Sequence, residues 1–343
     1  MPYGRRHTGP YAAIDLVPVF EHQLTHSNLT AGESVVIVTD TAFDPVHAAA
    51  CLGAAQALGA HAQIVTLPAR ATVLPRAFGP MLAASDLIVG ATTHLLHYRD
   101  DVRAALDGGA RALLAMQPPH ALERLRADPE VIERTQRGAR RLDGTRTVRI
   151  RSPHGTDLTL DVRDRPALAH YGVADRPGHL DFWGSAMVEI AQHEDATNGT
   201  LVLAPGDLTF HLGRFVEAPV TIHVEAGRIV RIEGGLDAIL IREQLASYRD
   251  PNAWIAGHIA WGTDPRARWT APLVQFPDAG TGNADSEGRL GAVQVQFGSN
   301  DDRWFRGANA SAAHFGLCTL GASVDLDGTT VIEDGVLLEA VGG

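Results

Sequence analysis

Residues 34–40 read Ser-Val-Val-Ile-Val-Thr-Asp (SVVIVTD), a run of β-branched apolar residues that ends in a polar turn. Such a run predicts a strand that is buried on both faces. The segment DPVHAAACLGAAQALGA (44–60) follows directly, with Asp44 and Pro45 at its start and Gly59 near its end. Asp then Pro is typical of a helix start, and Gly of a helix end. A buried strand followed by a helix indicates an α/β fold.

The same alternation continues to about residue 145 and then changes. Up to that point it predicts a mostly parallel sheet covered by helices on both faces. The segment RTVRIRSPHGTDLTLDVR (146–163) instead alternates with period two around a turn, as hairpins do. We therefore predict an α/β domain over residues 1–145 and a β-rich α+β domain over residues 146–343. The other predicted strands of the first domain are 61–67, 85–93 and 110–116, its other helices are 76–84 and 128–142, and one helix, 236–248, interrupts the second domain.

Composition excludes several classes of protein. The chain has 343 residues and a net charge of -11, which argues against nucleic acid or an acidic membrane surface as a partner. It contains no lysine, so Schiff-base and P-loop lysines are excluded. Its two cysteines, Cys51 and Cys318, exclude a disulfide scaffold and a multi-cysteine metal site. Neither a signal peptide nor a membrane span is indicated, and a cytoplasmic location is expected.

Two familiar site motifs are missing as well. No Gly-x-Gly-x-x-Gly follows the first strand, so dinucleotide binding has no support. The chain also lacks the Gly-x-Ser-x-Gly motif of one large class of hydrolases. The chemistry has to come from other side chains.

Two histidines in the second half lie in apolar surroundings. His314 is part of NASAAHFGLC (309–318), and His258 is on the apolar strand of GHIAWGTDPRARW (257–269). Each is a candidate metal ligand, and a buried histidine hydrogen-bonded to the protein is the alternative for both. The local sequence leaves both interpretations open.

Further candidates come from both halves. Glu189 lies between Val188 and Ile190, and a carboxylate in apolar company needs a partner. Glu194 follows in a more polar segment. His94 and His97, in ATTHLLHYRDD (91–101), come directly after a predicted strand, at the sheet edge where α/β proteins place their sites. Helix-capping or surface histidines are the alternative there.

The order of motifs resembles a known superfamily. An α/β half is followed by NGTLVLAPGD, EAGRIVRIEGG, GHIAWGTDPRARW, NASAAHFGLC and SVDLDGTTVIEDG. This order resembles the aminopeptidase T (M29) superfamily, and within it the branch of 2,5-dihydroxypyridine 5,6-dioxygenase. The resemblance extends over most of the chain and implies a homo-oligomer. The peptidases bind two metals through a Gly-Glu pair and a later strand histidine, which here read Gly257-His258 and Gln294. Both departures count against a dinuclear peptidase.

In the dioxygenase branch, two histidines and one carboxylate hold one Fe(II), and His258 and His314 match the histidines. The aspartate expected two residues after His314 is replaced by Gly316. Residues i and i+2 of a strand share a face, so the glycine leaves the site one ligand short. We predict Glu189 as the third ligand, with Glu194 as the fallback, and expect Asp at position 316 to tighten iron binding. Alternatively, an exogenous anion or water fills the gap, or the metal is bound weakly or lost.

The resemblance implies a mononuclear iron enzyme that uses O2 to cleave a hydroxylated N-heterocycle or related aromatic. His94 or His97 is expected to act as acid or base on the substrate, because imidazole titrates near pH 6.5. Arg266, or Arg268, is expected to neutralise an anionic substrate, in a site between the two halves. A divergent metallopeptidase with a zinc pair, and a metal-free enzyme or binding protein, are the alternatives.

Overall fold

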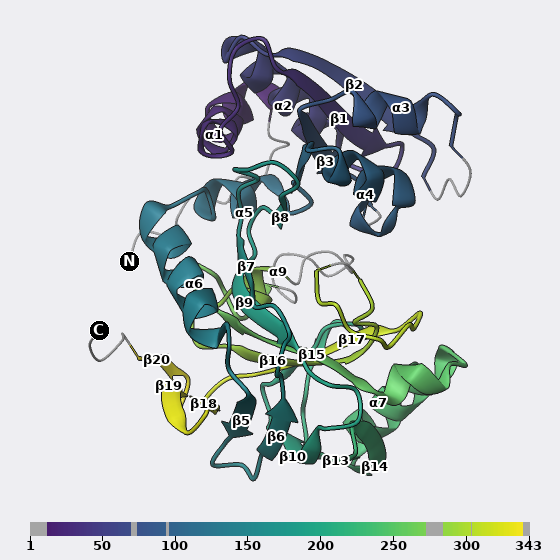
Figure 1. Ribbon diagram of the computed structural model, residues 1–343, viewed down its shortest axis with the longest axis vertical. Coiled ribbons are helices and arrows are strands. Elements are labelled where there is room, and N and C mark those ends of the chain that lie inside the picture. The colour runs from purple at the N-terminus through teal and green to yellow at the C-terminus, as the bar shows by residue number, and fades with distance from the viewer. Residues whose placement is uncertain (1–11, 70–73, 94–95, 272–283, 303, 339–343) are drawn as a thin grey trace. The chain divides into compact units, whose positions relative to one another are not determined.

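The computed structural model describes residues 12–69, 74–93, 96–271, 284–302 and 304–338 (Figure 1). Its contacts divide the chain into two compact units. The first comprises Met1–Asp128 and Tyr171–Gly184, and the second Pro129–His170 and Ser185–Gly343. No helix in the described part of the chain is long and apolar enough to cross a membrane.

The first unit is built on a five-stranded sheet with the order β2-β1-β3-β4-β8, in which every pairing is parallel. Consecutive residues of the central strands β1, β3 and β4 are buried, with only Ser34 partly exposed, so both faces of these strands are covered. Helices α1 and α2 pack together on one face, with Phe20 and Trp183 in edge-to-face contact in the same core cluster. The edge strand β2 is largely exposed. The strands are β1 (Ser34–Asp40), β2 (His61–Leu67), β3 (Leu87–Ala91), β4 (Arg111–Leu114) and β8 (Leu180–Phe182).

The four helices predicted from the sequence, at 44–60, 76–84, 128–142 and 236–248, begin and end close to where the sequence places them. In α2 the carboxylate of Asp44 accepts a hydrogen bond from the backbone N–H of Val46 at 3.0 Å, and Pro45 is the first helical residue. This is the N-cap that the Asp-Pro pair predicts. The helices are α1 (Ala13–His26), α2 (Pro45–Ala57), α3 (Phe78–Ala83), α4 (Asp100–Asp107), α5 (Pro119–Arg124), α6 (Pro129–Leu142), α7 (Leu236–Ser247) and α9 (Ala284–Glu287), with 3-10 turns η1 (Leu96–Tyr98) and η2 (Pro251–Trp254).

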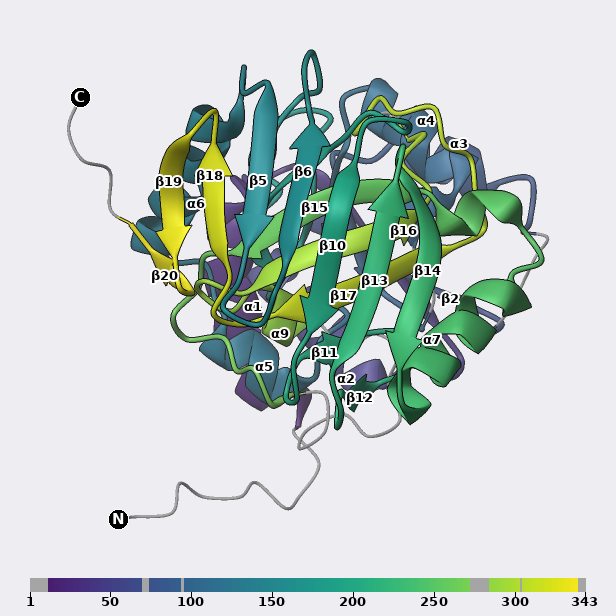
Figure 2. The same ribbon diagram turned by 90° about the horizontal axis from the view of Figure 1, so that it is seen from below.

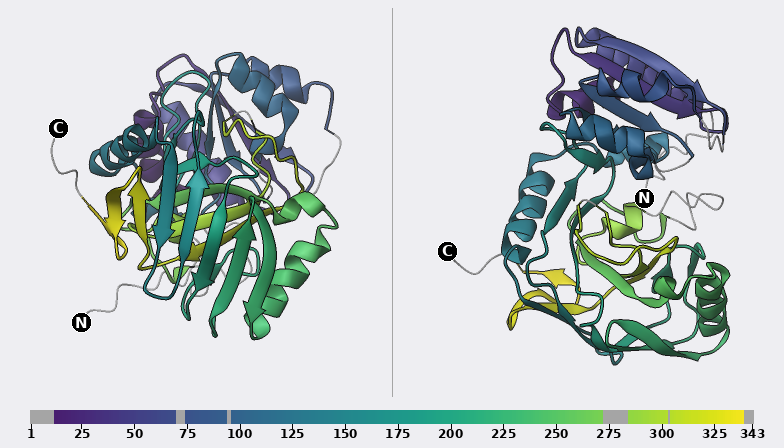
Figure 3. Two further views of the ribbon diagram at one scale, coloured as in Figure 1. Left: turned by 60° about the horizontal axis from the view of Figure 1, so that its bottom comes forward. Right: turned by 45° about the vertical axis from the view of Figure 1, so that its right-hand side comes forward.

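The second unit contains two packed sheets. Figure 2 shows the eight-stranded sheet, β14-β13-β10-β6-β5-β18-β19-β20, in front of the seven-stranded sheet, whose strands β15, β16 and β17 run across behind it. The seven-stranded order is β12-β11-β17-β16-β15-β9-β7. Helix α7 packs along the β14 edge (Figure 3), and α6 packs against β9. The strands are β5 (Thr147–Arg151), β6 (Asp157–Asp161), β7 (Leu168–Tyr171), β9 (Ala186–Ala191), β10 (Asn198–Leu203), β11 (Leu208–Thr209), β12 (Arg214–Phe215), β13 (Val220–Glu225), β14 (Arg228–Gly234), β15 (Ala256–Gly262), β16 (Val293–Gly298), β17 (His314–Thr319), β18 (Ser323–Leu326), β19 (Thr329–Glu333) and β20 (Val336–Leu337).

One hydrophobic core fills the space between these two sheets. The seven-stranded sheet contributes every second residue of its central strands, among them Ile259, Trp261, Val295 and Leu317. The eight-stranded sheet contributes its own alternate residues in the same way. The architecture confirms the predicted fold class, a mostly parallel α/β sheet followed by a β-rich part with antiparallel sheets.

The division of the chain differs from a single boundary at residue 145 in two respects. Helix α6 belongs to the second unit, because it packs on β9, with Gly138 close against Val188. Residues 171–184 return to the first unit, because they add β8 to its parallel sheet beside β4.

Ile259 tests the shared core of the second unit. It is fully buried between the two sheets, so Ile259→Ala should lower the free energy of unfolding by about 2–5 kcal/mol, through lost burial and a cavity. Val230 on β14 is half exposed, and Val230→Ala should change it by less than about 0.5 kcal/mol. Chemical denaturation followed by circular dichroism measures both, and equal losses would contradict this core.

Candidate functional site

The face of the seven-stranded sheet that points away from the shared core carries polar side chains. On β15, β16 and β17 the residues that alternate with the core residues include the two predicted histidines and two glutamines. Residues directly opposite each other on antiparallel strands share a face of the sheet. Glu189 on β9 lies opposite Ala260, so it belongs to this face as well. We call this set the polar face: Glu189, His258, Gln294, Gln296 and His314.

Glu189 and His258 are in contact on the polar face. The Nε2 atom of His258 lies 3.5 Å from Oε2 of Glu189, and the two residues are 2% and 5% exposed. On the other side of Glu189, Nε2 of His170 lies 2.5 Å from Oε1. One buried carboxylate therefore lies between two imidazoles, one from β7 and one from β15. They are the polar partners that a carboxylate among apolar residues needs.

His258 also contacts two rings. The ring of Phe305 stacks on it at 4.4 Å between centroids, and the ring of His314 lies at 5.3 Å, tilted by 40°. Burial lowers the pKa of His258 to about 4; the Glu189 carboxylate opposes this effect, and His170 adds to it. The imidazole is therefore neutral at neutral pH, the form that binds metal ions. The structure thus brings all three predicted metal ligands, His258, His314 and Glu189, to one face of one sheet.

A second carboxyl group acts electrostatically on this cluster. Burial and, to a lesser degree, the negative charge of Glu189 raise the pKa of Glu287, at the end of α9, to about 7, while His170 opposes both effects. Two carboxylates close together in a buried place cannot both ionise cheaply. Near neutral pH, Glu287 therefore exchanges a proton while Glu189 stays within reach of two imidazoles.

Glu194 has a different role from the one considered for it as the fallback ligand. Its carboxylate accepts from Arg165 Nη2 at 3.0 and 3.1 Å, from Asn300 Nδ2 at 3.1 Å and from the backbone N–H of Ala308 at 2.7 Å. Arg165 also donates to the carbonyl of Arg306. Glu194 therefore links the end of β9 to the segment that carries Phe305. Both of its carboxylate oxygens already accept hydrogen bonds from the protein.

The arginines and histidines predicted to contact substrate are placed as follows. The guanidinium of Arg266 donates to both oxygens of the buried Asp264, at 3.0 and 2.8 Å, and Arg268 is exposed. His97 is buried in η1, after β3, with its ring edge-on to Phe182 at 5.1 Å. His94 lies outside the described residues. His97 belongs to the first unit, so its part in the site stays a prediction.

Three residues of the site were missed by sequence reasoning. Gln296 could have been found, because Val293-Gln-Val-Gln-Phe297 places glutamines at alternate positions of an apolar strand. His170 and Glu287 had no such signal, since one lies in a four-residue strand and the other closes a four-residue helix.

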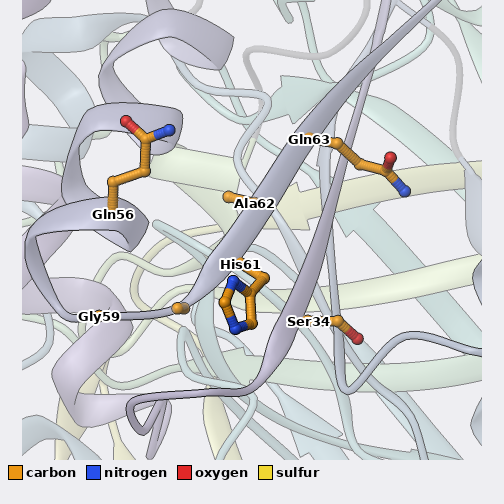
Figure 4. A pocket seen from close by; sticks show the side chains of 7 residues that line it. Ser34, Gln56, Gly59, His61, Ala62 and Gln63 are labelled. Carbon is orange, nitrogen blue, oxygen red and sulfur yellow. The ribbon is translucent and has the colours of Figure 1, made fainter.

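One cavity in the described part of the chain is not part of the polar face. It has a volume of about 600 Å³ and lies in the first unit, where Ser34, Gln56 and residues 59–63 line it. Figure 4 shows His61, Gln63 and Ser34 around it. One imidazole and two amides provide neither a set of metal ligands nor an acid–base pair, so the polar face is the better candidate for the functional site.

Comparisons with known proteins identify relatives over most of the chain. Residues 15–339 match the family model for 2,5-dihydroxypyridine 5,6-dioxygenase. A 2,5-dihydroxypyridine 5,6-dioxygenase of Pseudomonas putida is 32% identical over 281 residues, which cover 76% of this chain and 79% of that protein.

Two solved structures agree with these matches. The 2,5-dihydroxypyridine dioxygenase from Pseudomonas putida KT2440 is similar with a TM-score of 0.90 and 29% identity, over 97% of this chain and 99% of that one. AmpT from Thermus thermophilus is similar with a TM-score of 0.67 and 13% identity, over 95% and 99% of the two chains. At that identity the second likeness shows the fold alone.

Glu287 gives a pH-dependent prediction. Its folded-state pKa is raised from 4.5 to about 7, so in this window the folded chain holds a proton that the unfolded chain has released. Stability from this group is therefore present below pH 4.5 and is lost as the pH rises to about 7. Glu287→Gln should leave stability unchanged near pH 4.5 and raise it at pH 8, by an amount on the order of 3 kcal/mol. Denaturation at both pH values measures this, and a gain independent of pH would contradict it.

The ion pair of Glu194 with Arg165 gives a second prediction about stability. Glu194→Gln leaves the Arg165 guanidinium, which is 10% exposed, without its counter-ion and should destabilise the protein by about 1–3 kcal/mol. Glu217→Gln is the matched control, because that side chain is 82% exposed, and it should cost less than about 0.5 kcal/mol. Metal content should be unchanged in both variants, and metal loss in Glu194→Gln alone would restore Glu194 as a ligand.

Proposed function

Because the chain belongs to the 2,5-dihydroxypyridine 5,6-dioxygenase family, we propose that it uses Fe(II) and O2 to open the ring of a hydroxylated N-heterocycle, with 2,5-dihydroxypyridine as the first substrate to test. Family membership makes the chain an oxidoreductase of the ring-cleaving dioxygenase type, and it confirms the resemblance seen in the motifs. The likeness to AmpT concerns the fold, so it gives no support to a divergent metallopeptidase.

The observation that carries the proposal is the group of Glu189, His258 and His314 on the polar face. Two imidazoles and one carboxylate are the donor set that ferrous oxygenases use. His258 is neutral, and its Nε2 faces Oε2 of Glu189 at 3.5 Å, so one ion could bind both atoms at ordinary metal–ligand distances of about 2.0–2.2 Å. The residues therefore fit the metal that a dioxygenase requires.

The side chains of Glu189, His258 and His314 are close together, but they are not arranged as a complete metal site. Among the described residues, no three His, Cys, Asp or Glu side chains are arranged to hold a metal ion as they stand. The contact between Glu189 and His258 is made, and the ring of His314 is 5.3 Å from that of His258. Metal binding would therefore draw His314 toward an existing pair.

The neighbouring residues fix the orientation of this pair. Phe305 stacks on the His258 ring and sets its plane, and His170 holds the far oxygen of Glu189. Partners of this kind orient metal ligands and raise their basicity. A bound ferrous ion supplies the redox chemistry that O2 requires. The exchangeable imidazole proton of His97 is our proposed acid or base, and Arg266 our proposed partner for an anionic substrate, with Asp264 holding its guanidinium in place.

The test is oxygen uptake by the purified chain loaded with Fe(II) under anaerobic conditions. Addition of 2,5-dihydroxypyridine and O2 should consume the two in equal amounts, and both atoms of 18O2 should appear in an opened-ring product. An iron-loaded chain that takes up no O2 with this or any other dihydroxypyridine would overturn the proposal.

His258→Gln should lose Fe(II) affinity by more than about 100-fold, because even the partners of metal ligands are worth about 10–100-fold. His223→Gln is the matched control: His223 lies on β13 and pairs with Glu233, away from the polar face, and its loss should leave iron content unchanged. Iron per chain after gel filtration measures both, and iron retention by His258→Gln would show that the metal lies elsewhere.

A further inference from the structure

Gly316 stands beside Gln296 on the polar face. The strand register places His258 opposite Gln296, and Gln296 opposite Gly316. Directly opposite residues of antiparallel strands project to the same face. The three positions therefore form one row across β15, β16 and β17, and Gln296 is in the middle of it.

The space that a side chain at position 316 would need is already occupied. A Cβ atom on Gly316 would lie 2.6 Å from Cδ2 of Phe210, 2.9 Å from Nε2 of Gln294 and 3.0 Å from Oε1 of Gln296. The nearest oxygen to that missing Cβ is therefore an amide oxygen. An aspartate at 316 would project its carboxylate from this same point, and the oxygen of Gln296 lies 3.0 Å from it.

Within the residues that the structure describes, the amide of Gln296 is held in place by one hydrogen bond. Nε2 of Gln294 donates to Oε1 of Gln296 at 2.9 Å. A carbonyl oxygen has two lone pairs, so one acceptor site of this oxygen remains after that bond. Gln296 is 0% exposed, and its Nε2 has no partner among the residues that the structure describes. An amide buried with so much of its hydrogen-bonding capacity unused is costly unless something else binds there.

We propose that the side-chain oxygen of Gln296 binds the metal of this site in the place of the aspartate that Gly316 lacks, with Gln294 orienting it. The inference rests on the proposed function, and it adds a neutral oxygen donor to His258, His314 and Glu189. Amide carbonyl oxygens are established ligands of divalent cations.

This assignment has a consequence for the ligand. An amide carries no charge, so the centre keeps one more positive charge than a centre with an additional carboxylate. An anionic ring oxygen, such as a deprotonated ring hydroxyl, then gains more from binding the centre than a neutral one. The chemistry therefore favours substrates that bind as hydroxylates.

The experiment compares Fe(II) affinity in three variants, by anaerobic titration against a ferrous chelator. Gln296→Met keeps the length of the side chain and removes the oxygen, and affinity should fall by about 10–100-fold. Gln296→Glu supplies a carboxylate at the same length, and affinity should rise by about tenfold or more. Gln294→Met is the matched control on the same strand face. It removes only the hydrogen bond that orients Gln296, so its loss of Fe(II) affinity should be smaller than that of Gln296→Met.

The outcomes separate this inference from the proposed function. If the unmodified chain binds Fe(II) and opens the ring, and Gln296→Met binds Fe(II) equally well, the assignment of Gln296 is wrong while the function stands. If the unmodified chain binds no Fe(II), both are wrong. If Gln296→Met does not fold, judged by its circular dichroism, Gln296→Glu decides: unchanged or weaker Fe(II) binding would overturn the assignment, and tighter binding would support it.

Discussion

The contact between Glu189 and His258 is the constraint around which the second unit is organised. A carboxylate that is 5% exposed, on a strand whose neighbouring residues enter a hydrophobic core, is tolerated only if polar partners reach it. His170 and His258 provide these partners from the strands β7 and β15. Because the side chains of a strand alternate, a register shift of one residue would bury this carboxylate in the core and turn Ile190 away from it. The packing of the two sheets and the chemistry of the polar face are therefore fixed by the same strand register.

Much of the fold follows from local patterns that act over short distances. The strand at residues 34–40 and the helix that starts after Asp44 were both predicted from the sequence, since β-branched runs and N-caps are local signals. The period-two segment after residue 145 likewise became the hairpin of β5 and β6. The return of residues 171–184 to the first unit could not be predicted, because it depends on β8 pairing with a strand almost seventy residues earlier, and no local pattern specifies that pairing.

The site was predictable where chemistry and periodicity coincide. His258, His314 and Glu189 were identified because a polar side chain in an apolar strand is conspicuous, and they do share one face. Glu194 shows the limit of that reasoning. Its segment is polar, and the sequence offered it as the fallback metal ligand, yet it accepts four hydrogen bonds from Arg165, Asn300 and Ala308. Those donors are distant in sequence, so only the folded chain reveals that this carboxylate is structural.

Gly316 shows how a departure from a family pattern is read once the neighbours are known. In the sequence the glycine is a missing ligand, and the simplest expectation is that an aspartate there would restore it. In the structure the place of that side chain is taken by Phe210, Gln294 and Gln296, so an added carboxylate would first have to displace them. Gln294 and Gln296 lie on the same face of β16 and are hydrogen-bonded to each other, so the loss of a charged side chain on β17 and the presence of two amides on β16 form one arrangement. An amide pair tolerates burial far better than an unpaired carboxylate does, because it has no charge to neutralise. The polar face therefore keeps an oxygen beside His258 while carrying only one carboxylate, that of Glu189.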